Sequence, residues 1–188
     1  MATIVEDTRQ KVGKHGLKNG WWAAHGVEVV RRKLDFGDYV RADGYGNISI
    51  DTKQDLMELA MDLGRDHDRF VRECERAAGA GYRLVILTEQ APPPGVPAAD
   101  WVSDWVNDRC AACRHFLAFN GKGAAEPCHP NAIGRNRCRR YGYRPMPGWQ
   151  LAKTMGTVAA RHGARFSFCA PADAAQAVCD LLGVPYIQ

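Results

Sequence analysis

Two acidic residues and a lysine are the side chains of this sequence whose types and spacing best fit catalysis. Asp38 follows a Phe-Gly pair, and Asp51 is separated from Lys53 by one residue, on what read as two neighbouring strands. Side chains on a strand alternate between its faces, so Asp51 and Lys53 should point the same way. Two converging carboxylates can hold a hard divalent cation such as Mg²⁺, and a nearby lysine can stabilise an attacking hydroxide or a phosphate. This combination is typical of a metal-dependent nuclease.

The acid-x-lysine pattern is weak on its own, because a surface strand with alternating charges has the same spacing. Here Asp51 follows Ile48 and Ile50, so we expect it to lie on their face of the strand, away from water. A shielded carboxylate is costly unless it is paired or bound to a metal. The context therefore favours a functional site over a solvated strand face.

Three segments carry acidic and basic residues in a recognisable order. They are Val5-Glu6-Asp7-Thr8-Arg9-Gln10, Phe36-Gly37-Asp38-Tyr39 and Ile50-Asp51-Thr52-Lys53. Together they resemble the V-x-D-x-R-E, G-D-Y and E-R-K motifs of the XPF-like structure-specific endonucleases, a branch of the PD-(D/E)XK nucleases. The likeness covers roughly residues 3–90 and 147–184. It suggests a stand-alone nuclease domain of the kind found in phages and bacteria.

The resemblance implies hydrolysis of phosphodiesters in branched or flap-like DNA by a homodimer. The catalytic residues that it implies are Asp7, Arg9, Asp38, Asp51 and Lys53. Asp38 and Asp51, with the main-chain carbonyl of Thr52, would bind catalytic Mg²⁺ or Mn²⁺. Lys53 would orient the attacking water. Asp7 would hold the metal or Lys53, and Arg9 would contact a phosphate.

The sequence departs from the family pattern at three positions. Asp51 stands for a glutamate, Thr52 for an arginine and Gln10 for a glutamate. An aspartate still ligates metal, whereas loss of the arginine removes a cation near the phosphate. The family's acid after the lysine could correspond to Asp55, although the spacing is shorter. The departures keep open a non-catalytic DNA-binding or recruitment module, and within the enzymes a Holliday-junction resolvase.

The elements that must position these residues read as alternating strands and helices. The expected strands are 3–6, 27–34, 38–41, 47–51, 83–88 and 164–169, and the expected helices are 17–25, 56–63, 70–77, 100–106, 148–162 and one after Pro171. This alternation predicts an α/β fold of the PD-(D/E)XK type, with a mixed sheet flanked by helices. The apolar run 83–88 should be a central strand covered on both faces. We divide the chain into a nuclease core of 1–92 and 146–188 and an insert of 107–145.

The predicted insert contains a group of cysteines with metal-ligand spacing. The four candidate ligands are Cys110, Cys113, Cys128 and Cys138. A C-x₂-C pair lets two thiolates bind one Zn²⁺ from a tight turn, and two more complete a tetrahedron. His115 or His129 could replace one cysteine, and reduced thiols without metal remain the alternative. A structural zinc would supply the folding energy that this segment, poor in apolar periodicity, lacks.

Basic residues lie at two places where they could grip DNA. In the insert they are Arg135, Arg137, Arg139 and Arg140, with Tyr141 beside them, and near the catalytic strands they are Arg31 and Lys33. Arginines contact phosphates and tyrosines stack on unpaired bases. A solvated basic loop has the same composition.

Composition permits this function without specifying it. The 188 residues fit one domain with a small insert, and 46% are hydrophobic, which excludes global disorder. A net charge of +4 and a pI near 8.7 are compatible with binding nucleic acid. The sequence shows neither a membrane-length apolar run nor a signal peptide, so we expect a cytoplasmic protein of a bacterium or a phage-infected host, with reduced cysteines.

Overall fold

The computed structural model describes residues 2–11, 13, 16–113 and 145–187. Within them the strands are β1 Thr3–Asp7, β2 Glu28–Arg32, β3 Tyr39–Arg41, β4 Ile48–Lys53, β5 Arg83–Thr88 and β6 Arg165–Phe168. The helices are α1 Gly16–Ala24, α2 Leu56–Leu63, α3 His67–Gly79, α4 Ala98–Asp104, α5 Asp108–Ala111, α7 Gly148–His162 and α8 Ala174–Leu182. Short 3₁₀ turns cover Tyr45–Asn47 and Pro171–Asp173.

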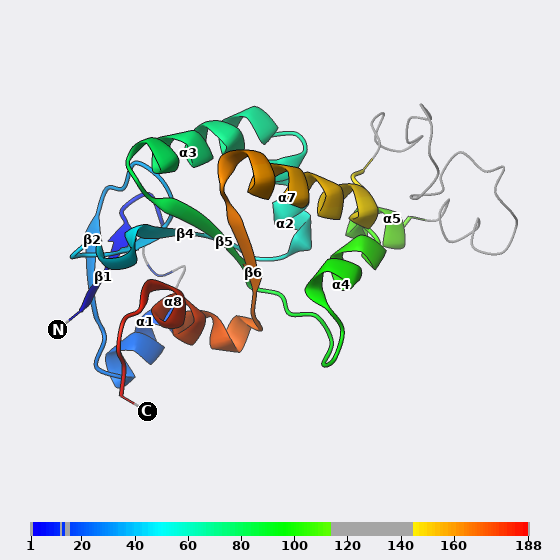
Figure 1. Cartoon of the computed structure of the whole chain (residues 1–188). Coiled ribbons are helices and arrows are strands. Elements are labelled where there is room, and N and C mark those ends of the chain that lie inside the picture. Colours follow the sequence, from blue (N-terminus) through cyan, green and yellow to red (C-terminus); the bar gives the residue numbers. More distant parts are fainter. Residues whose placement is uncertain (1, 12, 14–15, 114–144, 188) are drawn as a thin grey trace, which may run out of the picture.

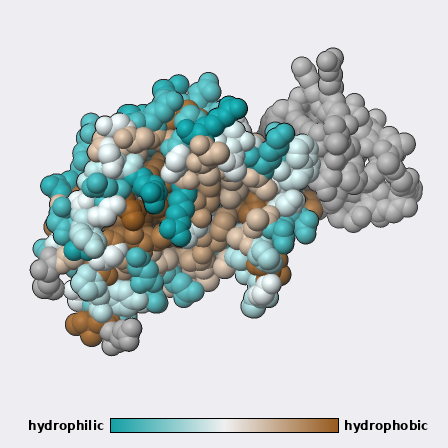
Figure 2. All heavy atoms as spheres, viewed as in Figure 1, coloured by the Kyte–Doolittle hydropathy of each residue, from teal (hydrophilic) through white to brown (hydrophobic). Residues whose placement is uncertain are grey.

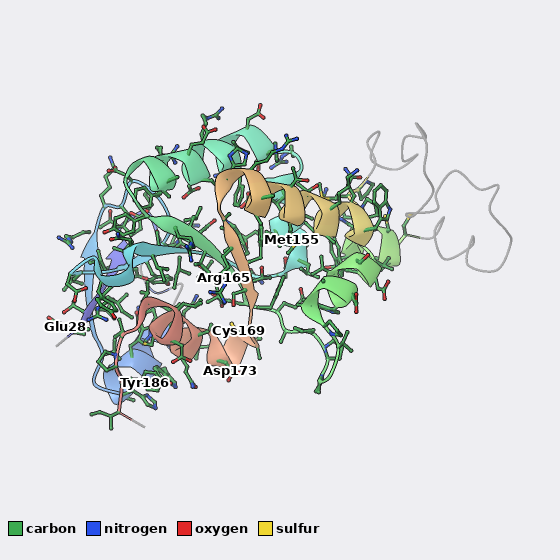
Figure 3. The ribbon with its side chains drawn as sticks, in the orientation of Figure 1. Glu28, Met155, Arg165, Cys169, Asp173 and Tyr186 are labelled. Carbon is green, nitrogen blue, oxygen red and sulfur yellow. The ribbon has the colours of Figure 1, made fainter. Side chains whose placement is uncertain are left out.

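The strands form one mixed sheet in the order β2-β1-β3-β4-β5-β6 (Figure 1). Strands β1 and β2 are parallel, β3 is antiparallel to both of its neighbours, and β4, β5 and β6 run parallel. Figure 3 labels Glu28 on β2 and Arg165 on β6, which mark the two edges of the sheet. The mixed sheet flanked by helices confirms the predicted fold class.

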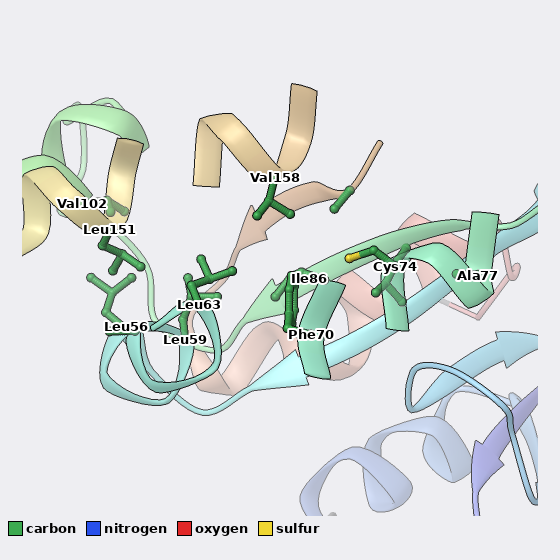
Figure 4. Packing of buried hydrophobic residues seen from close by; sticks show 13 residues of the cluster. Leu56, Leu59, Leu63, Phe70, Cys74, Ala77, Ile86, Val102, Leu151 and Val158 are labelled. Carbon is green, nitrogen blue, oxygen red and sulfur yellow. The ribbon is translucent and has the colours of Figure 1, made fainter. Parts of the chain in front are cut away.

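Helices cover both faces of the sheet and create two apolar clusters. On one face α2, α3 and α7 pack around Ile86 of β5, with Phe70 and Val158 among the buried residues (Figure 4). On the other face α1 and α8 pack against Val85 and Leu87 of the same strand. Strand β5 is therefore buried on both sides, as its continuous apolar run predicts.

Strand register puts the candidate catalytic residues on a single face. Ile50 pairs with Tyr39 and belongs to the α1/α8 cluster, whereas Asp51 pairs with Ile86 and faces α2 and α3. The expectation that Asp51 shares a face with Ile48 and Ile50 is therefore wrong: adjacent residues of a strand point to opposite faces, and Asp51 is shielded by α2 and α3 instead. Lys53 shares the face of Asp51 because side chains alternate along a strand.

Several predicted boundaries shift by a few residues. The predicted strand 27–34 ends at Arg32, so Lys33 lies beyond β2. The predicted strand 47–51 continues to Lys53 because β5 pairs with it along its whole length. The predicted helix 100–106 is α4, which begins directly after Pro97.

Hydrogen bonds join the two described segments that flank residues 114–144. Asn107 donates a side-chain hydrogen bond to the carbonyl of Met146 at 3.2 Å, and Gly148 N–H bonds to the carbonyl of Trp105 at 3.1 Å. A Cβ at Gly148 would lie 2.3 Å from the carbonyl oxygen of Val102, so only glycine lets α7 approach α4 this closely. Most of the predicted insert 107–145 lies outside the described residues.

The surface in Figure 2 is polar over most of the rim, with apolar residues in the middle of this face. None of the described helices combines the length and the apolar composition that a bilayer crossing requires.

Candidate active site

A polar cavity of about 210 Å³ opens where β1 and β4 end, beneath helices α2 and α3. Its described lining is made of Asp7, Arg9, Gln10, Gly37, Asp38, Asp51, Thr52, Lys53, Glu58, Asp62, Arg69, Phe70 and Glu73. All five residues expected to be catalytic are in this set. The structure therefore brings together side chains from four separate elements and the loop before β3.

Asp38 accepts hydrogen bonds from Gln10 and Thr52, two of the three residues that depart from the family pattern. Its Oδ2 accepts hydrogen bonds from the Thr52 backbone N–H at 2.9 Å and from the Thr52 hydroxyl at 2.6 Å. Its Oδ1 accepts a short hydrogen bond from the Gln10 amide. A glutamate at position 10 would place a second negative charge there, whereas the amide donates. Gln10 and Thr52 therefore fix the orientation of the Asp38 carboxylate.

Asp51, Lys53 and Asp62 form a buried chain of charges. The Lys53 ammonium lies 3.0 and 2.8 Å from the two carboxylate oxygens of Asp51 and 2.7 Å from Asp62. Asp51 Oδ1 accepts a hydrogen bond from the Lys53 ammonium. Asp51 Oδ2 is also close to the ammonium but accepts no hydrogen bond from the described residues. Burial lowers the pKa of Lys53, but the adjacent carboxylates outweigh burial, raise it and keep the ammonium charged.

Burial raises the pKa of the Asp51 carboxyl above its usual value, more strongly than Lys53 lowers it. A cation beside this carboxylate would favour the ionised form. Asp51 Oδ2 lies 2.8 Å from the Lys53 ammonium but accepts no hydrogen bond from the described residues, and Asp38 lines the same cavity. Carboxylate oxygens are the ligands that Mg²⁺ and Mn²⁺ prefer, so the donor set fits such an ion.

Asp62 and Glu73 are residues of the site that the motifs do not include. Arg69 Nη2 lies 2.8 Å from Asp62 Oδ1, so Asp62 links Lys53 to a largely exposed guanidinium. Glu73 of α3 also lines the cavity and accepts a hydrogen bond from Gly37 N–H at 2.8 Å. The sequence does contain a signal for Asp62: Glu58 and Asp62 are two acids one turn apart in an otherwise apolar helix.

Asp55, considered as the acid after the lysine, has a structural role instead. Its carboxylate accepts a hydrogen bond from Glu58 N–H at 2.8 Å and caps the N-terminus of α2. Glu58 in turn accepts from Gln54 N–H at 2.7 Å. The acid that reaches Lys53 is thus Asp62, two turns further along α2.

Asp7 and Arg9 interact with each other at the cavity wall. The Asp7 carboxylate pairs with the Arg9 guanidinium and accepts from the backbone N–H groups of Arg9 and Leu34, each at 3.2 Å. Arg9 also donates to the Leu34 carbonyl at 2.9 Å. The bonded carboxylates of Lys53 are those of Asp51 and Asp62, so Asp7 positions Arg9 rather than Lys53 in this structure.

Arg31 and Lys33 are not among the described residues that line the cavity. Arg31 lies 3.2 Å from Glu6 and donates to the Gln10 carbonyl, which ties β2 to the segment after β1. Lys33 is exposed. Their proposed contact with DNA stays a prediction.

The residues predicted for zinc and DNA binding in the insert are mostly beyond what the structure describes. Cys128, Cys138, Arg135, Arg137, Arg139, Arg140 and Tyr141 lie outside the described residues. Cys110 is in α5, and Cys113 follows it with its N–H bonded to the Cys110 carbonyl at 2.9 Å. Within the described ranges, no three His, Cys, Asp or Glu side chains group as metal ligands.

Comparison with known proteins supports the fold through structure rather than sequence. No protein-family model matches the chain, and no curated protein is significantly similar to it in sequence. Among solved structures it is similar to XPF from Aeropyrum pernix in complex with DNA, with a TM-score of 0.54 and 15% identity. The match covers 98% of this chain and 64% of that one, so the chain spans less than two thirds of its length. The described chain therefore has an XPF-like α/β fold.

Proposed function

We propose that this protein is a divalent-metal-dependent DNA endonuclease that cuts branched or flap-like DNA. The observation that carries the proposal is the convergence of Asp38, Asp51 and Lys53 in one polar cavity at the carboxyl ends of β1 and β4. The XPF-like fold supports it, since the similar Aeropyrum pernix structure is a complex with DNA.

Each residue of the cavity has a defined task in phosphodiester hydrolysis. Asp38 and Asp51 would hold Mg²⁺ or Mn²⁺, which lowers the pKa of a bound water and polarises the scissile phosphate. Lys53 orients the attacking water and neutralises charge that develops on the phosphate. Arg9, which follows β1, and Arg69, on α3, each present a cation to the DNA backbone.

The substrate and the assembly are part of the same proposal. By family resemblance the DNA would be a flap, a fork or a four-way junction, and the active form a homodimer. Analytical ultracentrifugation of the purified protein tests the dimer directly.

Cleavage of labelled DNA tests the chemistry. Flap, fork, four-way-junction and linear substrates are incubated with Mg²⁺, Mn²⁺ or EDTA, for the wild type and for Asp51→Asn. We expect cutting that requires metal and that the variant loses by at least about a hundredfold. The preferred substrate separates a flap nuclease from a junction resolvase.

A matched control is Asp43→Asn, which makes the same chemical change at an exposed turn outside the cavity. It should cut normally. Binding of DNA without any cutting, unaffected by metal and by Asp38→Ala, would instead establish the non-catalytic recruitment module.

The insert is proposed to hold a structural zinc ion through Cys110, Cys113, Cys128 and Cys138. Elemental analysis of protein purified without chelators should give about one zinc per chain. Cys113→Ser should lower that content and the thermal stability together. Protein that carries no zinc and melts at the same temperature as Cys113→Ser would contradict the proposal.

A further inference from the structure

A second cavity, of about 500 Å³, lies against a different face of helix α2 from the catalytic cavity. Its apolar wall contains the half-buried side chains of Met57, Met61 and Met146. Arg65 and Arg109 also line it, and none of its described lining residues is acidic. Its volume is in the range of pockets that hold a small organic ligand.

Helix α2 is a wall shared by the two cavities. Glu58 and Asp62 line the catalytic cavity, and their sequence neighbours Met57 and Met61 line the second one. A helix with its side chains is about 10–12 Å across. The two cavities therefore lie on different faces of one helix, a separation that a few nucleotides of a DNA strand can span.

The chemistry of the lining suits a nucleobase. Methionine thioethers are polarisable and make favourable contacts with aromatic rings, and every base offers a flat π-face. Arg109 Nη2 lies 3.9 Å from Met61 Sδ, so a cation stands directly beside the apolar wall. The Arg65 side chain is 73% exposed and pairs with Asp66 at 3.4 Å at the rim of the cavity, where such a solvated pair can be exchanged for a phosphate of the same nucleotide.

We propose that this cavity receives one unpaired base of the DNA strand close to the phosphate that is cut. The inference rests on the proposed nuclease function. It would give preference for DNA with a single-stranded segment at the cleavage position, because a base in an intact duplex is already stacked on both faces.

The test is a coupling experiment with abasic DNA. A flap or fork substrate is made with one abasic nucleotide at each position near the cut in turn, and binding is measured by fluorescence anisotropy without divalent metal. At one position the abasic change should weaken binding to the wild type about tenfold. The Met57→Ala/Met61→Ala double variant should bind intact and abasic DNA equally at that position, since the effects are not additive when they remove one contact.

The matched control is Met155→Ala on α7, where the methionine packs against the core cluster. It should keep the full abasic penalty. Equal abasic penalties in the wild type and the double variant would overturn the inference while leaving the nuclease proposal intact. A wild type that neither binds nor cuts any substrate would overturn both. Alanine favours helix, so loss of the fold is not expected in the double variant, and a thermal melt checks this.

Discussion

The two faces of strand β4 carry different kinds of side chain, apolar on one face and charged on the other, although they are almost equally buried. Ile50 has no exposed surface and packs among apolar side chains under α1 and α8. Asp51 and Lys53 are 6% and 8% exposed, and face each other and Asp62 beneath α2. Burial alone therefore does not separate a core from a site. What separates them is whether the buried atoms need a partner.

One face of β4 contributes to stability, and the other carries the candidate catalytic residues. Apolar area removed from water contributes about 25 cal/mol per Å², and the cluster around Ile50 on the α1/α8 face supplies such area. Buried charges cost desolvation energy that their pairing only partly offsets. The α2/α3 face thus holds its carboxylates close together at the expense of stability, and the four predictions below test this division.

The largest effect is expected for Lys53→Met. The variant removes the cation between Asp51 and Asp62, so cleavage should fall at least about a hundredfold. Asp51 would lose its cation and Asp62 would keep only Arg69, which should lower the free energy of unfolding by about 3–5 kcal/mol. Single-turnover cleavage and urea unfolding measure the two effects. Lys153→Met, at an exposed position of α7, is the control, and normal cleavage by Lys53→Met would refute the site.

On the opposite face, Leu87→Ala should affect stability alone. Leu87 is fully buried in the α1/α8 cluster, and the cavity left behind should cost about 2–5 kcal/mol. The cleavage rate per folded molecule, measured well below the melting temperature, should stay within about twofold of the wild type. A large loss of cleavage by the folded variant would show that the two faces are coupled.

Gly37→Ala should damage both properties because Gly37 precedes Asp38. Its φ is +65°, and a Cβ would lie 2.2 Å from Ser49 Oγ and 2.9 Å from the Ile50 carbonyl oxygen. The left-handed backbone alone costs about 1–2 kcal/mol for a residue with a Cβ. Thermal melts and cleavage assays should both decline. Adding Ser49→Ala should recover part of the loss, and full recovery would mean that backbone strain plays no role.

The smallest effect is expected for Thr52→Val, which keeps the shape and removes the hydroxyl that donates to Asp38. Loss of this hydrogen bond should cost about 1 kcal/mol and lower cleavage modestly. Thr52→Ser should restore both. Thr157→Val makes the same change where the hydroxyl bonds to a helical carbonyl, and it should not alter cleavage. Equal cleavage by the two valine variants would show that the Thr52 hydroxyl does not position Asp38.

The strands and the carboxylates on them could be predicted because both depend on local patterns. The apolar run at 83–88 and the acid-x-lysine spacing at 51–53 specify a strand and a shared face without knowledge of the tertiary structure. Glu73 could not be selected in this way, because the polar positions of α3 look alike until packing fixes which of them face the sheet. Glu58 and Asp62 stand out in an apolar helix, but their spacing does not show which of them meets Lys53.

Asp55 shows how spacing can point to the wrong carboxylate. The sequence Asp55-Leu56-Met57-Glu58 before an apolar helix has the pattern of an N-terminal cap, in which the acid binds backbone N–H groups. That pattern explains Asp55 fully and leaves no need for a catalytic role. The hydrogen bonds of Gln10 and Thr52 to Asp38 depend on strand register and became visible only in the structure.

The closure between Asn107 and Met146 has an evolutionary consequence. Every residue assigned to the catalytic cavity precedes Gly79, and the chain that leaves after Cys113 returns beside its point of departure, where α4 and α7 are locked together at Gly148. Residues 114–144 can thus change in length and composition without shifting the register of β4. Such a position lets natural selection, or a protein engineer, replace this segment while the residues of the catalytic cavity stay constant.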